Sequence, residues 1–204
     1  VGISVACDGF EGYFPFGHET GFNFPKNKVV DFFKKVCASD NTKVFHNAPY
    51  DIGWLRTLGI EVKGKIVDTM IVAPLIDENQ FYYSLNGLGR EYLNEGKTEA
   101  ELNAAAAEWG LDPKAEMWRL PSAYVGTYAT QDAVLTLKLW DYFKVEIEKQ
   151  NLWNVFDLEM ELLPIIIEMK RVGVRVDLER AEKIKKELIT KEKNLIKSIQ
   201  DQSG

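Results

Sequence analysis

The amino-acid sequence predicts an α/β fold in which helices flank a mixed sheet and the C-terminal part is largely helical. Two apolar runs on either side of an Asp-Gly pair begin the chain, which is typical of an antiparallel hairpin. Short apolar strands then alternate with helical patterns, as they do in sheets with parallel pairing. After residue 84 nearly every apolar pattern has helical spacing.

The composition is that of a packed protein. Hydrophobic residues make up 46% and charged residues 27% of the 204 positions, which excludes a wholly disordered chain. The net charge of −6 comes from residues 1–150, because residues 151–204 hold 10 basic and 10 acidic side chains. A strongly basic nucleic-acid clamp is therefore excluded, although carboxylates that hold divalent cations can still meet phosphates.

Cysteine content and hydropathy indicate the cellular compartment of the protein and its relation to membranes. Cys7 and Cys37 have no metal-type spacing, so we expect neither a disulfide framework nor structural zinc, and a reducing, cytoplasmic location. No apolar run approaches the ~18 residues of a membrane span, so we expect no membrane partner.

The first half of the chain contains the expected strands and the helices between them. Pro15 indicates that the second hairpin strand lies at a sheet edge, because proline cannot donate to a ladder. Pro49 suits a first helical turn, whose N–H groups have no partner within the helix. The expected elements are strands over 1–7 and 12–17, a helix over 28–37, a strand over 43–46, a helix that ends at Leu58, and a strand over 65–67 before a helix that Asp68 caps.

The second half is expected to be helical with one exception. The spacing predicts helices over 84–93, 99–109, 124–150 and 158–169, the last with a kink at Pro164 and an end at Gly173. Residues 174–176 are expected to form a short strand, after which Asp177 caps an amphipathic helix. The change of character after Asn151 predicts a domain over 1–150 and the beginning of another in 151–204.

Asp132 lies within an apolar stripe of the long predicted helix. A buried carboxylate needs a partner or a metal ion, and Tyr128 lies one turn earlier on the same face. A phenol and a carboxylate so placed can position a water molecule and a cation together. The alternative is a core aspartate that is hydrogen-bonded to a backbone group.

The segment Asn47-Ala-Pro-Tyr-Asp51 follows a buried strand and opens a helix. Asp51 then lies in the first helical turn, where backbone donors and the helix dipole favour its ionised form. An ionised carboxylate in that place is a good oxygen ligand for Mg²⁺ or Mn²⁺. An aspartate that only stabilises the helix start is the alternative.

Together these two segments resemble the second and third exonuclease motifs of the DEDD superfamily. The pattern is Asn47-x-x-Tyr50-Asp51 after a strand and Tyr128-x-x-x-Asp132 on a helix, and the second tyrosine is typical of the DEDDy branch. The segments 67–70, 84–93 and 161–177 resemble family A DNA polymerases, and their residues are most like those of bacteriophage members. The resemblance covers nearly the whole chain. It implies a ribonuclease H-like exonuclease domain over 1–150, then a connector and the first helix of the polymerase thumb over 151–204.

The resemblance also implies a mechanism, namely proofreading from the 3′ end by two-metal phosphodiester hydrolysis. Asp132 is expected to bind the Mg²⁺ or Mn²⁺ ion that carries the attacking water, Asp51 to hold the second ion, and Tyr128 to orient the water. Asn47 and Tyr50 are expected to contact the nucleic acid. The implied partners are the single-stranded 3′ primer end of DNA and the chain's own polymerase domain, which carries out template-directed synthesis. No motif identifies a processivity partner.

The first exonuclease motif, an Asp-x-Glu on the central strand of the family's sheet, is absent from the chain. We therefore expect an internal piece of a longer protein from which this strand is cut off, and which is inactive by itself. Two alternatives stay open. Residues 151–177 argue against a free-standing DEDDy nuclease, and the retained Asp51, Tyr128 and Asp132 argue against a non-catalytic scaffold or nucleic-acid-binding module.

Several other polar and aromatic residues have plainer interpretations. His18 is expected to support a turn, His46 to pack at a strand end, and Asp68 to cap a helix. The aromatic side chains at 109, 118 and 124 suit either a strand-binding cleft or core packing.

Overall fold

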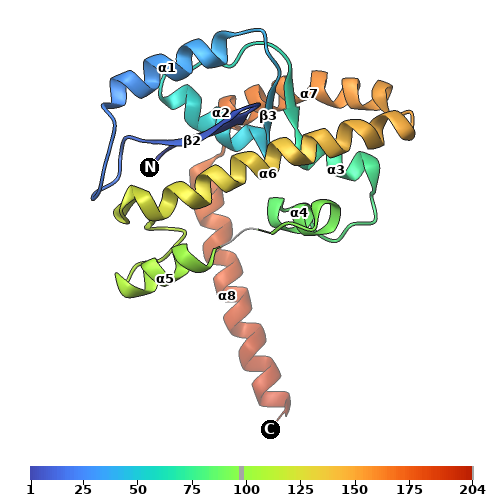
Figure 1. Cartoon of the computed structure of the whole chain (residues 1–204). Helices are drawn as coiled ribbons and strands as arrows, with labels where there is room; N and C mark the ends of the chain where they lie inside the picture. Colours follow the sequence, from blue (N-terminus) through green and yellow to red (C-terminus); the bar gives the residue numbers. More distant parts are fainter. Residues whose placement is uncertain (97–98, 204) are drawn as a thin grey trace. The chain divides into compact units, whose positions relative to one another are not determined.

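The structure, a computed structural model, describes residues 1–96 and 99–203 (Figure 1). By contacts the chain divides into two compact units, Val1–Glu168 and Met169–Gly204. The strands are β1 (Gly2–Cys7), β2 (Phe10–Pro15), β3 (Lys43–Phe45) and β4 (Ile66–Asp68). The helices are α1 (Lys26–Ala38), α2 (Ala48–Thr57), α3 (Thr69–Ile76), α4 (Leu85–Leu93), α5 (Ala100–Glu108), a short 3-10 helix (Met117–Arg119), α6 (Ser122–Lys149), α7 (Trp153–Val172) and α8 (Leu178–Ser203).

The α/β class is confirmed, and the strands fall into two pairs. β1 and β2 form the expected antiparallel hairpin, whose turn is made possible by Gly9 at φ +77°. β3 and β4 pair in parallel, with Phe45 opposite Asp68 at the end of the ladder. Within the part of the chain that the structure describes, β1 pairs only with β2 and β3 only with β4, so the two pairs are separate sheets.

Helix α6 brings the two strand pairs together. It packs against β1, β2 and β3 and against α3, α4 and α5, and Figure 1 shows it as the long yellow helix that crosses the strands. Its side chains at helical spacing enter the largest hydrophobic cluster of the first unit, which follows from the apolar stripe in the sequence. The buried members from α6 are Leu135, Leu139, Trp140, Phe143 and Ile147, and those from α7 are Phe156, Met160, Leu163 and Ile167.

A buried histidine fastens the hairpin to the start of α6. The Nδ1 atom of His18 lies 2.8 Å from the Leu120 carbonyl oxygen, and its Nε2 atom lies 2.6 Å from the Tyr13 hydroxyl. Because a carbonyl only accepts, Nδ1 carries the hydrogen and the neutral ring accepts from Tyr13 through Nε2. Burial is the main cause that lowers the pKa of His18. His18 thus has the structural role that its place in a turn suggested.

The second unit corrects one prediction and confirms another. The strand expected over 174–176 is wrong, since residues 173–177 have no regular structure and are exposed. A strand requires a ladder partner, and no strand in the described residues pairs with this segment. Gly173, at φ +72°, ends α7, and the Asp177 carboxylate caps α8 by accepting from the Arg180 N–H at 3.0 Å.

The boundary of the first compact unit does not coincide with residue 150. The first part of α7 packs on the same core as α6, through the side chains already named, and the unit continues to Glu168. The functional division at residue 150 stays a prediction, because packing does not assign function. No helix in the described ranges is long and apolar enough to cross a membrane.

The close approach of α4 to α6 depends on Gly89, and Gly53 in α2 provides a control. A Cβ atom added at Gly89 would lie 2.8 Å from the Glu95 carbonyl oxygen and 2.9 Å from a Leu135 methyl carbon. We expect Gly89→Ala to destabilise the protein by ~1–3 kcal/mol through overpacking. Gly53→Ala in α2, where nothing lies within 4 Å, should instead stabilise it by ~0.5–1 kcal/mol. Thermal melts of the two variants measure both signs, and a neutral Gly89→Ala would contradict the close approach.

Candidate active site

A sharp turn at the end of β3 positions Asp51. Asn47 adopts a left-handed conformation at φ 70° and ψ 54°, which asparagine tolerates better than most residues. The chain then enters α2 at Ala48, with Pro49 in the first turn. Asp51 lies in this first turn, as the sequence predicted, close to the carboxyl end of β3.

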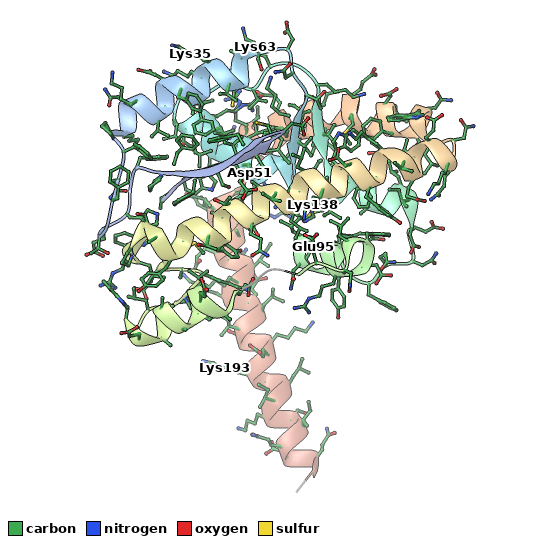
Figure 2. All side chains as sticks on the ribbon, in the orientation of Figure 1. Lys35, Asp51, Lys63, Glu95, Lys138 and Lys193 are labelled. Atoms are coloured by element: carbon green, nitrogen blue, oxygen red, sulfur yellow. The ribbon has the colours of Figure 1, made fainter. Side chains whose placement is uncertain are left out.

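The middle of α6 supplies the second group of site residues. Tyr128 and Asp132 are both half-buried and lie one helical turn apart, on the face that the apolar stripe predicted. Figure 2 shows Asp51 beside the middle of α6, and the electrostatic influence of Asp132 on Asp51 agrees with that proximity. The structure thus brings Asp51 near Asp132, which is far from it in the sequence and lies one helical turn from Tyr128.

The carboxylates around Asp51 create a concentration of negative charge. Burial, and after it the nearby carboxylates of Asp68 and Asp132, raise the pKa of Asp51 to about 6. Buried like charges are unfavourable for folding, and such clusters are common at functional sites, where a cation or substrate relieves them.

Asp68 does more than the helix cap that the sequence predicted. Its carboxylate accepts from the Met70 N–H at 2.9 Å, which confirms the cap of α3. It also accepts from the N–H groups of Asn47 at 2.9 Å and Ala48 at 2.7 Å, at the start of α2. Sequence reasoning missed this link because its partners lie about twenty positions earlier in the chain. Parallel pairing of the two strands was the available signal, since it places both strand ends at one sheet edge.

Two exposed aromatic side chains border Asp51 on α2. Tyr50 is 58% exposed and Trp54 is 59% exposed, and their ring centroids lie 6.4 Å apart in an edge-to-face arrangement. Trp54 follows Asp51 by three positions and Tyr50 by four, so the three residues share one side of the helix. Sequence reasoning named Tyr50 and missed Trp54, although this spacing was readable.

His46 lies at the strand end and takes part in local hydrogen bonding. Its Nδ1 atom is 2.9 Å from the Thr69 hydroxyl oxygen, and that hydroxyl donates to the Phe45 carbonyl oxygen at 3.1 Å. This arrangement agrees with a packed rather than a catalytic histidine. The aromatic side chains of Trp109, Trp118 and Tyr124 are all about half exposed, and a cleft role for them stays a prediction.

The donor set fits part of a divalent-cation site. Among residues 1–96 and 99–203 no group of three or more His, Cys, Asp or Glu side chains could hold a metal ion. Asp51 and Asp132 offer two carboxylates, the ligand type that Mg²⁺ and Mn²⁺ prefer. The Asp68 oxygens are engaged by backbone N–H groups. The residues present therefore fit one half of an oxygen-ligand set.

Comparison with known proteins identifies the family. Residues 10–148 match the family model described as 3′–5′ exonuclease, the exonuclease domain of DNA polymerase A. The chain belongs to this family, which confirms the resemblance drawn from its motifs. Such a domain is a nuclease, and exonuclease domains of this family generally use divalent metals.

Relatives of the chain are DNA polymerases of phages and bacteria. A DNA-directed DNA polymerase of Pseudomonas phage M6 is 38% identical over 100% of this chain, which covers 31% of that polymerase. The DNA polymerase DpoZ of Salmonella phage PMBT28 is 38% identical over 69% of the chain and 23% of its own length. DNA polymerase I of Chloroflexus aurantiacus is 25% identical over 100% of the chain and 22% of its own length. The chain spans less than a third of these relatives.

Solved structures share the fold. The POL domain of Pol1 from M. smegmatis, in a complex with DNA primer-template and dNTP, matches with a TM-score of 0.64 at 20% identity, over 91% of this chain and 28% of that one. A nuclease in its apo form matches with a TM-score of 0.60 at 18% identity, over 81% of this chain and 72% of that one. At these identities the likeness concerns the fold alone.

The raised pKa of Asp51 predicts a pH-dependent stability. Between pH 3.8 and about 6 the native state keeps a proton that the unfolded state has lost, so this residue lowers stability as pH rises through that window. Asp51→Asn removes the charge, and we expect it to raise the melting temperature at pH 7.5 in EDTA but not at pH 3.5.

Asp112 supplies a control of opposite sign. Its carboxylate accepts from the N–H groups of Lys114 and Ala115, which lowers its pKa, so its ionised form stabilises the native state at neutral pH. Asp112→Asn should therefore lower the melting temperature slightly at pH 7.5. Equal melting temperatures for Asp51→Asn and the parent at both pH values would contradict the charge cluster.

Proposed function

We propose that the chain is the 3′–5′ proofreading exonuclease domain of a DNA polymerase and removes nucleotides one at a time from a frayed 3′ primer end. The observation that carries the proposal is the proximity of Asp51 from α2 to Asp132 from α6, with Tyr128 one helical turn from Asp132, in segments that resemble the family's motifs. Residues 151–204 would then form the connector and the first helix of the polymerase thumb. The protein would work in the cytoplasm of the host cell if a phage encodes it.

Two divalent cations, Mg²⁺ or Mn²⁺, complete the proposed site. When bound, such a pair stabilises the attacking and leaving oxygens of phosphodiester hydrolysis. Asp132 would hold one ion and Asp51 the other, largely through water. The Tyr128 hydroxyl, one turn from Asp132, would orient the attacking water. The shared negative charge of the carboxylates explains why cations would bind strongly there.

A further strand would complete the ligand set. β1 and β3 each have a ladder on one side only within the described residues, and both pack against α6. A strand that carries the Asp-x-Glu pair and lies between them would satisfy both edges, because an edge strand presents unpaired N–H and C=O groups. This placement would bring its carboxylates toward Asp51 and Asp132. The chain without that strand would lack half the metal ligands.

The exposed rings on α2 support a single-stranded substrate. Bases that are splayed from a frayed end can stack on aromatic side chains, an interaction worth ~1–3 kcal/mol per base. Tyr50 and Trp54 are exposed and border Asp51, and the turn at Asn47 lies beside them. These three residues are the proposed contacts to DNA.

The main test is an exonuclease assay on the chain extended upstream through the Asp-x-Glu strand, with a labelled single-stranded DNA oligonucleotide and Mg²⁺. Asp132→Ala should lower kcat by ~100-fold or more, because a lost metal ligand removes several kcal/mol of transition-state stabilisation. Asp141→Ala is the matched control, since Asp141 lies on the same helix and pairs with Lys144 at the surface. It should retain full activity.

Other outcomes of this assay would contradict different parts of the proposal. Activity in the extended parent that survives Asp132→Ala would contradict the assigned ligand. No activity in the parent would favour a non-catalytic scaffold that only positions the polymerase. Robust, EDTA-sensitive digestion by residues 1–204 alone would contradict the need for the further strand.

The stacking contact has its own test in the same extended protein. Trp54→Ala should raise KM for single-stranded DNA with little change in kcat, because a stacking ring binds ground state and transition state alike. Trp54→Phe keeps an aromatic face and should retain most of the affinity. An unchanged KM for Trp54→Ala would exclude this ring from the binding surface.

A further inference from the structure

The carboxylate of Asp68 is one of the most deeply buried polar groups in the first unit. The residue is 1% exposed and ends β4, directly opposite Phe45 in the parallel ladder. A buried carboxylate is unfavourable unless its oxygens accept hydrogen bonds. The bonds that satisfy Asp68 come from two different helix starts, which a simple cap would not require.

The two carboxylate oxygens divide their bonds between α2 and α3. Oδ1 accepts from the N–H groups of Asn47 and Met70, each at 2.9 Å, and Oδ2 accepts from the Ala48 N–H at 2.7 Å. The N–H groups of a first helical turn have no partner within their own helix. The Asp68 side chain therefore accepts from N–H groups at the starts of both helices, and its two carboxylate oxygens link the start of α2 to the start of α3.

The start of α2 lacks a side-chain cap of its own. Asn47 is in the left-handed conformation, which asparagine adopts more readily than most residues but less readily than glycine, and its side chain makes no capping hydrogen bond. Pro49 has no N–H to offer. The bonds from Asn47 and Ala48 to Asp68 thus oppose the relaxation of this turn, and Asp51 lies three residues beyond Ala48 on the same first turn.

The neighbouring Thr69 bonds to the two residues that precede this turn. Its hydroxyl donates to the Phe45 carbonyl oxygen at 3.1 Å and lies 2.9 Å from Nδ1 of His46. Residues 45–48 are therefore bonded by two consecutive side chains at the end of β4. Both anchors act on the segment between β3 and the first turn of α2.

We propose that Asp68 is a positioning residue of the exonuclease site, which holds the turn at Asn47 and Ala48 and thereby sets the place of the Asp51 carboxylate. The inference rests on the proposed function, since it concerns the role of Asp51 there. Capping of α3 is a separate and simpler task of the same side chain. The experiment must therefore separate the two tasks.

Serine at position 68 makes that separation. Serine is a good helix N-cap and can accept from the Met70 N–H, but its single short hydroxyl cannot also accept from Asn47 and Ala48. Asp68→Ser should keep the α3 cap and lose the link to α2. Asp68→Asn is the isosteric companion, since it keeps one carbonyl oxygen and places an NH₂ donor against a backbone N–H.

The measurements use the chain extended through the upstream strand, with three readouts. In Asp68→Ser we expect hydrogen-exchange protection to fall at the amides of Asn47 and Ala48 and to persist at Met70. Mn²⁺ affinity, measured by calorimetry without DNA, should fall by ~10–100-fold, as is typical when a residue that orients a metal ligand is lost. kcat should fall by a similar factor, because the Asp51 carboxylate is no longer held in place.

Contrary results would overturn the proposal directly. Parental Mn²⁺ affinity and kcat in Asp68→Ser would show that Asp68 only caps α3. Should the serine variant fail to fold, Asp68→Asn decides, and parental protection at Ala48 together with parental Mn²⁺ affinity in that variant would refute the link. A parent that binds Mn²⁺ but digests no DNA would refute the proposed function instead, which distinguishes the two failures.

Discussion

The packing of α6 across both strand pairs is the constraint on which the rest of the first unit depends. A single helix with an apolar stripe contacts both strands of the hairpin and β3, so the two strand pairs pack on the same helix without sharing a ladder. The same stripe contains Asp132, whose carboxylate is therefore brought into a region that apolar packing has already partly dehydrated. Burial and charge are combined there by the geometry of one helix.

Much of this arrangement could be predicted from local patterns. Periodicity located the hairpin, the short strands and the helices, because each pattern reflects the face that a residue must bury. The motif around Asp51 and the pair Tyr128 and Asp132 were readable for the same reason, since both the turn and the helix spacing are encoded within a few positions. The strand expected over 174–176 failed because apolar alternation predicts a strand only where a neighbour can pair with it.

What could not be predicted depends on residues that are distant in sequence. The sequence around Asp68 predicts only a helix cap. Its hydrogen bonds to Asn47 and Ala48 arise only when β3 and β4 lie side by side. The raised pKa of Asp51 likewise comes first from burial and then from carboxylates on two other elements. Local propensity contains neither effect. Both effects arise from tertiary structure.

The parallel register of β3 and β4 has a consequence for folding itself. Side chains alternate between the faces of a strand, so a slip of one residue would turn Asp68 away from the start of α2 and present Val67 there instead. The slipped chain would bury a carboxylate with no backbone donors to receive it, which is strongly unfavourable. The ladder is only three residues long, too short to secure its alignment alone. The correct alignment is thus favoured by the same carboxylate that accepts from the start of α2, so misaligned pairing is disfavoured already during folding.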